Sequence, residues 1–153
     1  MEYLKLVFTN RILIGGLLGW ATAPVLKVII HLCVNKEFEI ERLFGDGGMP
    51  SGHSATVCAV ATSVAFECGL GSPIFALAAI LAIIVMHDAS GVRLETGKQA
   101  KVINEMVEFL EKMSGKDLTP EDKLKEFVGH THSQVFLGAI LGILVGVLFH
   151  IYS

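Results

Sequence analysis

Residues Gln134–Tyr152, QVFLGAILGILVGVLFHIY, form an apolar run of the length that a membrane helix needs. A helix rises about 1.5 Å per residue, and about 20 apolar residues cross a hydrocarbon core of about 30 Å. Three earlier segments are also apolar: about Ile12 to Val34, His53 to Cys68, and Pro73 to His87. The middle two reach only about 22–24 Å, so they need neighbouring helices or a thinned bilayer to span. The sequence predicts an all-α polytopic membrane bundle of about four spans, with residues 1–153 as a single domain.

The composition supports this class. The chain of 153 residues is 52% hydrophobic and carries a formal net charge of -3, and its mean hydropathy is +0.61. These values are typical of a small integral membrane protein. A negative net charge without a basic stripe among aromatic residues argues against nucleic acid as a partner.

Small residues recur on the predicted helices at a spacing of four. Gly15 and Gly19 form one such pair, and Gly138, Gly142 and Gly146 form a longer row. In lipid, such rows let helix backbones approach closely. We expect them to pack helices together, either within the monomer or across a homodimer. Pro24 is expected to break the first span.

The longest polar region, residues 88–133, contains a helical pattern of apolar residues at Ile103, Met106, Leu110 and Met113. It predicts an amphipathic helix from about Lys98 to Met113 that ends at Ser114-Gly115. Such a cytoplasmic insertion can lie on the membrane surface as a structural lid. A second short helix is expected to begin at Thr119.

Alternating spans would put residues 35–52 and 88–133 on the same side of the membrane. That side then holds most of the lysines and arginines, against Lys5 and Arg11 on the other. By the positive-inside rule, we expect an integral protein of the cytoplasmic membrane with its polar motifs facing the cytoplasm.

The motif Gly47-Gly48-Met49-Pro50-Ser51-Gly52-His53-Ser54-Ala55 stands where the second span begins. The first turn of a helix has unpaired N–H groups and the positive end of the helix dipole, and glycines let an anion approach. Ser51 and the Gly52 and His53 amides are therefore candidate phosphate donors. The plainer alternative is an ordinary turn, with His53 making no functional contact.

Other polar residues converge on the same side. Lys27 lies inside an apolar helix, Arg93 and Lys98 follow the third span, and His130 precedes the fourth. Lys27 could instead snorkel to headgroups, Arg93 and Lys98 could bind anionic lipid, and His130 could be a plain interfacial residue. Together, however, cations, N–H donors and two histidines suit phosphoryl transfer with a histidine nucleophile and a histidine acid. No metal-ligand spacing is evident, and we expect neither a metal nor another cofactor.

These residues carry a family resemblance. Pro50-Ser51-Gly52-His53 matches a motif of the type 2 phosphatidic acid phosphatase and vanadium haloperoxidase superfamily, and residues 130–138, HTHSQVFLG, resemble its H-x-x-x-D-V-x-x-G motif. The whole chain resembles a divergent branch with segments G-G-M-P-S-x-H-S-A, D-A-x-G-V-R-x-x-x-G-K-Q-A and G-H-T-x-x-x-V. The resemblance implies that His130 is the nucleophile, which forms a phosphohistidine, and that His53 protonates the leaving group. It also implies that Lys27, Ser51, Gly52 and Arg93 hold the phosphoryl oxygens.

The chain departs from that pattern in three places. Gln134 replaces the aspartate that follows the nucleophile, so it can orient the imidazole but lends no charge unless Asp88 or Glu126 substitutes. Leu124 and Lys125 stand near the place of the family's S-R dipeptide, whose charge Arg93 could supply. Lys27 alone represents the family's K-x6-R-P segment.

We therefore expect a metal-independent membrane phosphatase acting on a lipid phosphate or diphosphate, either phosphatidate-like or polyprenyl. The alternative is non-catalytic binding or transport of phospholipid or polyprenyl phosphate, which the lost aspartate favours. A vanadate-dependent haloperoxidase is disfavoured, because such enzymes are typically soluble.

Overall fold

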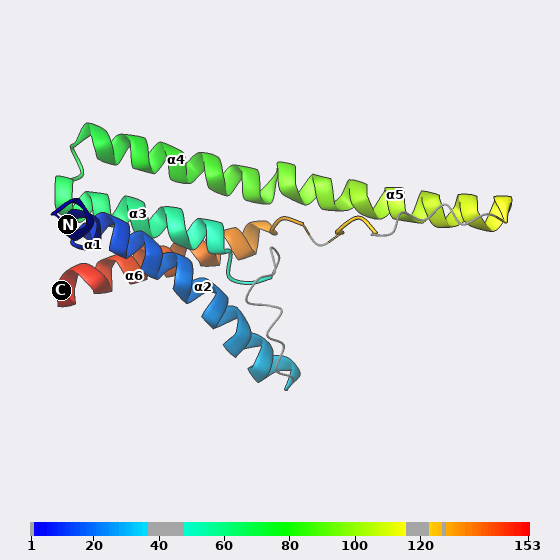
Figure 1. Cartoon of the computed structure of the whole chain (residues 1–153), viewed down its shortest axis with the longest axis horizontal. Helices are drawn as coiled ribbons and strands as arrows, with labels where there is room; N and C mark the ends of the chain where they lie inside the picture. The colour runs from blue at the N-terminus through cyan, green and yellow to red at the C-terminus, as the bar shows by residue number, and fades with distance from the viewer. Residues whose placement is uncertain (1, 37–47, 116–122, 127) are drawn as a thin grey trace.

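The computed structural model describes residues 2–36, 48–115, 123–126 and 128–153, and in these ranges the chain forms six helices (Figure 1). They are α1 (Glu2–Phe8), α2 (Arg11–Asn35), α3 (Gly52–Cys68), α4 (Pro73–Ser90), α5 (Val92–Ser114) and α6 (His132–Tyr152). The all-α prediction is confirmed. The short helix α1 was not predicted.

The bundle is built around α3, which packs against α2, α4 and α6. Helices α2 and α4 run in one direction and α3 and α6 in the other, so α3 and α6 are parallel neighbours (Figure 1). Among the described residues, three helices are long and apolar enough to cross a membrane: α2, the α4–α5 unit Pro73–Ser114, and α6. The fourth expected span, α3, has 17 residues and lies at the centre of the bundle.

Side-chain caps fix where the helices begin. Ser51, Ser72 and Thr131 are the N-caps of α3, α4 and α6, and each accepts a hydrogen bond from a backbone N–H three residues later. Such a cap satisfies one of the donors that a helix start leaves unpaired. Gly69, with φ of 84°, ends α3 in the tight turn that leads to α4.

The glycine row of α6 packs against α3. A Cβ added at Gly138, Gly142 or Gly146 would meet atoms of Ser51, Ala55 and Thr62 respectively. Backbone contact at this distance is possible only without side chains. The row thus packs within the monomer, and a homodimer stays a prediction.

The register of α2 against α3 follows from the same kind of contact. Gly16 faces Val60 and Gly19 faces Ala55 and Ala59, and a Cβ on Gly52 would lie 4.0 Å from that of Ala23. Lys27 follows Ala23 by one turn of α2, and it therefore lies just past the first residue of the antiparallel helix α3. The expected break at Pro24 is wrong, since α2 continues through it. Membrane helices tolerate proline because neighbouring groups satisfy the freed carbonyls.

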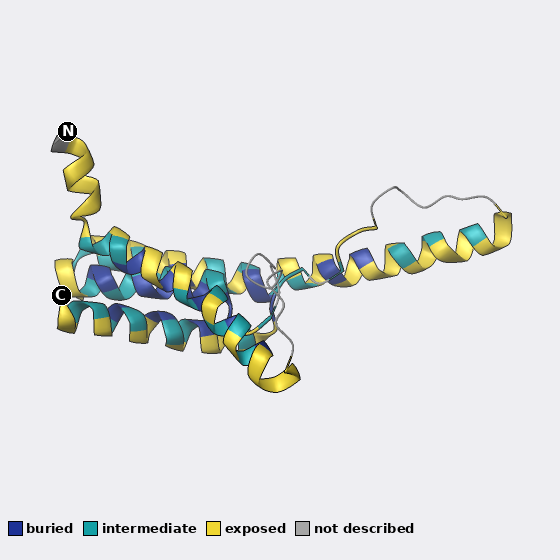
Figure 2. Cartoon of the chain, turned by 60° about the horizontal axis from the view of Figure 1, so that its bottom comes forward, coloured by how far each residue is buried: buried dark blue, intermediate teal, exposed yellow. Residues whose placement is uncertain are grey.

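The amphipathic helix differs most from its prediction. Helix α5 begins at Val92, six residues before the expected Lys98, and ends at Ser114 with Gly115 as its left-handed C-cap. It does not lie across the helix ends as a lid but continues the direction of α4 and projects from the bundle (Figure 1). Its apolar face, with Met106 58% and Phe109 62% exposed, is not covered by the bundle (Figure 2). The helix expected at Thr119 lies outside the described residues.

Candidate functional site

The parallel packing of α3 and α6 brings two histidines together. His53 is in the first turn of α3, and His130 lies just before α6, next to its N-cap. Their ring centroids are 6.0 Å apart with an interplanar angle of 64°. Two helix N-termini, each with the positive end of a helix dipole, thus lie side by side. An anion placed there would be stabilised by both helices.

His130 is held from several sides. It is 2% exposed, and its backbone N–H donates to the carbonyl of Ala89 at the end of α4 (2.9 Å). Its Nδ1 lies 3.3 Å from Oε1 of Gln134, and the backbone of Gly48 makes a further hydrogen bond with the ring. The imidazole therefore sits in a fixed position between α4, α6 and the loop before α3.

Gln134 also determines which ring nitrogen carries the proton. Its Oε1 accepts a hydrogen bond from the backbone N–H of Thr131 (3.1 Å), which completes a capping box at the start of α6. Because that oxygen can only accept, Nδ1 of His130 must donate to it. With Nδ1 as the donor to Gln134, the lone pair of the neutral ring is on Nε2.

The environment favours the neutral form of this ring. Burial lowers the pKa of His130 below its usual value, and the charge of Lys27 and the nearby His53 act in the same direction. The hydrogen bonds with Gln134 and Gly48 oppose them by favouring the charged form. A neutral imidazole near pH 7 is what a histidine nucleophile requires.

Three of the expected phosphate-binding residues lie beside the pair. Lys27 is 8% exposed, and its side chain passes Gly48 in the loop before α3. Gly52 is the first residue of α3, so its amide has no acceptor within that helix. Ser51 is fully buried, but its N–H donates to the carbonyl of Gln134 (3.0 Å). This bond ties the start of α3 to the start of α6, so the Ser51 amide is structural and its hydroxyl is what can still donate to a ligand.

The remaining candidates make contacts elsewhere. Arg93 donates from Nε to Oδ2 of Asp88 (2.9 Å), and both side chains are 45% exposed. Lys98 binds Glu95 on an exposed face of α5 (2.6 Å). Gln134 thus contacts His130, and its orienting role stays a prediction, whereas Asp88 contacts Arg93 instead.

The support that α5 provides to this site was not predicted. Residues 126 and 128–130 run along the first turns of α5, where a Cβ on Gly97 would meet the backbone of Glu126 and Val128. Gly129, with φ of 90°, contacts the backbone of Arg93 and Leu94. The segment that carries His130 is thus packed against a helix through two glycines. In the sequence, the glycine just before the candidate nucleophile, Gly129, was the signal that could have indicated this close packing.

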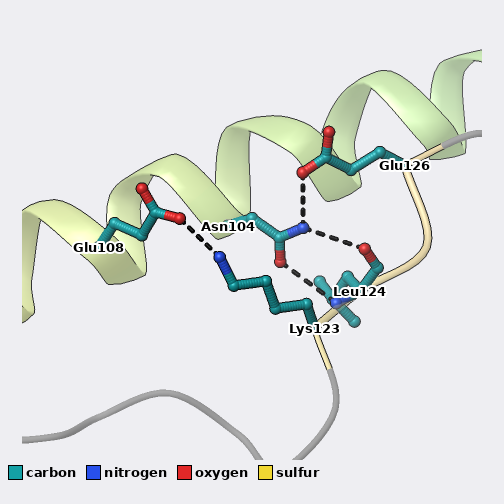
Figure 3. Close-up of polar contacts among 5 residues, drawn as sticks. All are labelled: Asn104, Glu108, Lys123, Leu124 and Glu126. Atoms are coloured by element: carbon teal, nitrogen blue, oxygen red, sulfur yellow. Dashed lines mark hydrogen bonds and ion pairs between the residues drawn. The ribbon is translucent and has the colours of Figure 1, made fainter.

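Polar contacts hold the same segment further along α5 (Figure 3). Asn104 donates to the carbonyl of Leu124 (3.0 Å) and to Glu126 Oε1 (2.9 Å), and it accepts from the N–H of Leu124 (3.2 Å). Lys123 binds Glu108 (2.7 Å). Glu126, the second possible substitute for the missing aspartate, is therefore bound to α5.

Comparison with known proteins agrees with the sequence motifs. A family model described as "Divergent PAP2 family" matches residues 8–145. The chain is 40% identical over 147 residues to the "Uncharacterized membrane protein YuiD" of Bacillus subtilis (strain 168), and the match covers 91% of this chain and 93% of that protein. No solved structure matches the chain. The family match covers most of the sequence and includes both histidines, and the chain belongs to the Divergent PAP2 family.

Proposed function

We propose that this protein is a metal-independent membrane phosphatase that hydrolyses a lipid phosphate or diphosphate, phosphatidate-like or polyprenyl, through a phosphohistidine. The observation that carries the proposal is the pairing of His53 with a buried, oriented His130 at two adjoining helix N-termini. A near-attack contact and a hydrogen bond are each about 3 Å long, so a phosphoryl group between the two histidines needs their reacting nitrogens several ångströms apart. The ring centroids, 6.0 Å apart, are consistent with such a separation.

The reaction would proceed in two steps. Nε2 of His130 attacks phosphorus, and the bond from phosphorus to the leaving oxygen breaks as protonated His53 gives that oxygen its proton. Neutral His53 then takes a proton from water, whose oxygen attacks the phosphohistidine. The phosphorus–nitrogen bond breaks, inorganic phosphate leaves, and both histidines return to their initial states.

The positive groups would supply the electrostatic stabilisation. Lys27 is buried near His130, and the amides at the start of α3 point at the same place. Donors fixed around developing charge commonly lower the barrier of such reactions more than any other single effect. Gln134 adds orientation but no charge, so the positive charge on the phosphohistidine ring lacks a carboxylate partner there, and turnover should be slow.

We further propose that the site faces the cytoplasm from the cytoplasmic membrane. Both histidines lie at the end of the bundle from which α5 projects, and the lysines and arginines of α5 are at that end (Figure 1). Excess lysine and arginine marks the cytoplasmic side of a membrane protein. Labelling of single cysteines on α5 with a membrane-impermeant reagent, in intact and in opened cells, tests this orientation.

Phosphate release by the detergent-purified protein tests the function. The panel contains phosphatidate, polyprenyl phosphate and polyprenyl diphosphate, each with EDTA present. The variants His130→Ala and His53→Ala are compared with His132→Ala, which removes an exposed histidine two residues from the proposed nucleophile. We expect vanadate-sensitive release that is lost in the first two variants and retained in the third.

The alternative is non-catalytic binding or transport of the same lipids. The replacement of aspartate by Gln134 favours it, because the charge that would stabilise the imidazolium is missing. Lipid phosphate that binds without release of phosphate from any member of the panel would support this alternative and refute the phosphatase. Release that EDTA abolishes would refute the metal-independent mechanism.

A further inference from the structure

We propose that the apolar chain of the lipid phosphate lies in a groove between α2 and α3, with its phosphate at the histidine pair. The inference rests on the proposed ligand class but not on turnover. It assigns a binding site for the part of the ligand that does not react, and it predicts which residues determine chain length.

The groove has a volume of about 360 Å³ and is lined by Leu13, Gly16, Leu17, Trp20, Thr56 and Val60. Gly16 lacks a side chain, and a Cβ there would lie 2.6 Å from Val60. The single hydroxyl in the lining, that of Thr56, donates to the carbonyl of Gly52 (2.8 Å). Its hydrogen-bonding need is therefore met within α3, and the groove presents an apolar surface.

On the α3 side, the groove lies on the helix face that begins at the candidate site. Residues three and seven apart lie on the same face of a helix, and His53, Thr56 and Val60 have this spacing. Thr56 and Val60 lie about 5 Å and 10 Å along the helix from His53. The face of α3 that begins with the proposed acid thus becomes the wall of the groove.

The α2 side shows the same continuity. Trp20 lies two turns, about 10 Å, before Lys27, and Leu13 lies two further turns away. Ala23 faces Gly52 near the site, and Gly16 faces Val60 further into the bundle. Helices α2 and α3 therefore stay side by side over the whole distance from the site to the groove. A ligand with a charged end at Lys27 and a long apolar tail fits this arrangement, since the polar end meets the buried cation and the tail meets an apolar wall.

The groove also opens where a lipid would enter. Trp20 is 61% exposed, Leu17 is 53% exposed, and both lie on a helix long and apolar enough to span the membrane. A tail could therefore move in sideways from the bilayer. A bulk lipid could occupy the same space, so the test must show that the occupant is recognised by its phosphate.

Photocrosslinking makes that distinction. Phosphatidic acid with a diazirine in one acyl chain is irradiated with the full-length protein in micelles, and the labelled peptides are mapped. Dodecyl phosphate and dodecanol are added as competitors that share one chain and differ in the phosphate. We expect labelling of residues 13–20 and 56–60 that dodecyl phosphate removes and dodecanol leaves unchanged.

A larger side chain in the groove provides a variant that can be compared with the same change at an exposed position. Val60→Phe places a ring in the groove, whereas Ile80→Phe adds a ring at a residue of α4 that is 57% exposed. Excluding about two methylenes of the chain weakens binding about tenfold. We expect Val60→Phe to reduce the competed labelling about tenfold and Ile80→Phe to leave it unchanged.

Each result bears on one proposal. Equal competition by dodecanol, or labelling that Val60→Phe does not change, would overturn the groove as the site of the ligand's chain. Competed labelling in a protein that releases no phosphate would refute the phosphatase and leave the groove standing, with the protein as a lipid-phosphate binder. If Val60→Phe does not fold, Thr56→Leu fills the same groove with a smaller change.

Discussion

Replacing Gln134 by glutamate would test the orientation of His130 directly. Oε1 of Gln134 lies 3.3 Å from Nδ1 of His130 and accepts from the N–H of Thr131. Glutamate has the same reach and suits a capping box as well as glutamine does. The change therefore adds a negative charge beside the imidazole while the start of α6 keeps its hydrogen bonds.

The size of the effect follows from the distance. Two opposite charges about 4 Å apart interact by about 4 kcal/mol at an effective dielectric constant of about 20, which corresponds to about three pKa units. Position 134 is partly exposed, and solvent screens part of this interaction. We expect Gln134→Glu to raise the pKa of His130 by about 1–3 units.

Histidine labelled with ¹³C reports this pKa through its chemical shift as a function of pH in detergent micelles. The variant His130→Asn identifies the resonance by its loss. Gln99→Glu is the control, because Gln99 is an exposed residue of α5 and the substitution adds the same charge. A His130 pKa that rises by less than about half a unit in Gln134→Glu, or that rises equally in Gln99→Glu, would refute the contact.

Three further predictions concern the packing around the site. Gly142→Ala should lower the free energy of unfolding by about 1–3 kcal/mol, because a Cβ there meets the backbone of Ala55. Thermal unfolding in detergent measures this change. Gly71→Ala is the control, because a Cβ at Gly71 would meet no neighbouring atom within 4 Å. Because the pKa of His130 is lowered in the folded protein, the folded state binds fewer protons than the unfolded chain. The free energy of unfolding should therefore fall as the pH drops below about 6.5 toward the folded pKa. His130→Asn should flatten this part of the pH profile, and an unchanged slope would contradict the lowered pKa of His130. Asn104→Ala removes three hydrogen bonds to residues 124 and 126, each worth about 1 kcal/mol. Hydrogen exchange of the Leu124 amide should therefore become faster. Equal exchange in the variant and the original protein would show that these bonds do not hold residues 124 and 126 against α5.

The helices of the bundle could be predicted because each has a local signal. Apolar runs, Ser72 before Pro73, and the glycine turn at Gly69 all act within a few residues, and the observed bounds lie close to the expected ones. The break at Pro24 was predicted from the same local logic and failed. The membrane helix keeps its course there because its neighbours compensate for the missing donor.

The candidate site could be predicted only in part. The motifs indicated that His53 and His130 begin helices, and these two helices proved to be parallel neighbours. The sequence could not indicate that Arg93 would turn to Asp88, because that choice depends on the direction in which α5 leaves α4. This direction depends on contacts between residues far apart in the sequence, such as those of Gly97 and Gly129.

The continuous α4–α5 helix has a mechanical consequence. Its 42 residues extend over about 63 Å, roughly twice the thickness of a hydrocarbon core. Its outer half is therefore long enough to extend beyond the hydrocarbon core, and Gly97, Asn104 and Glu108 of that half contact the chain that leads to His130. The position of the imidazole in the membrane protein is thus set in part by a helix that reaches past the hydrocarbon core.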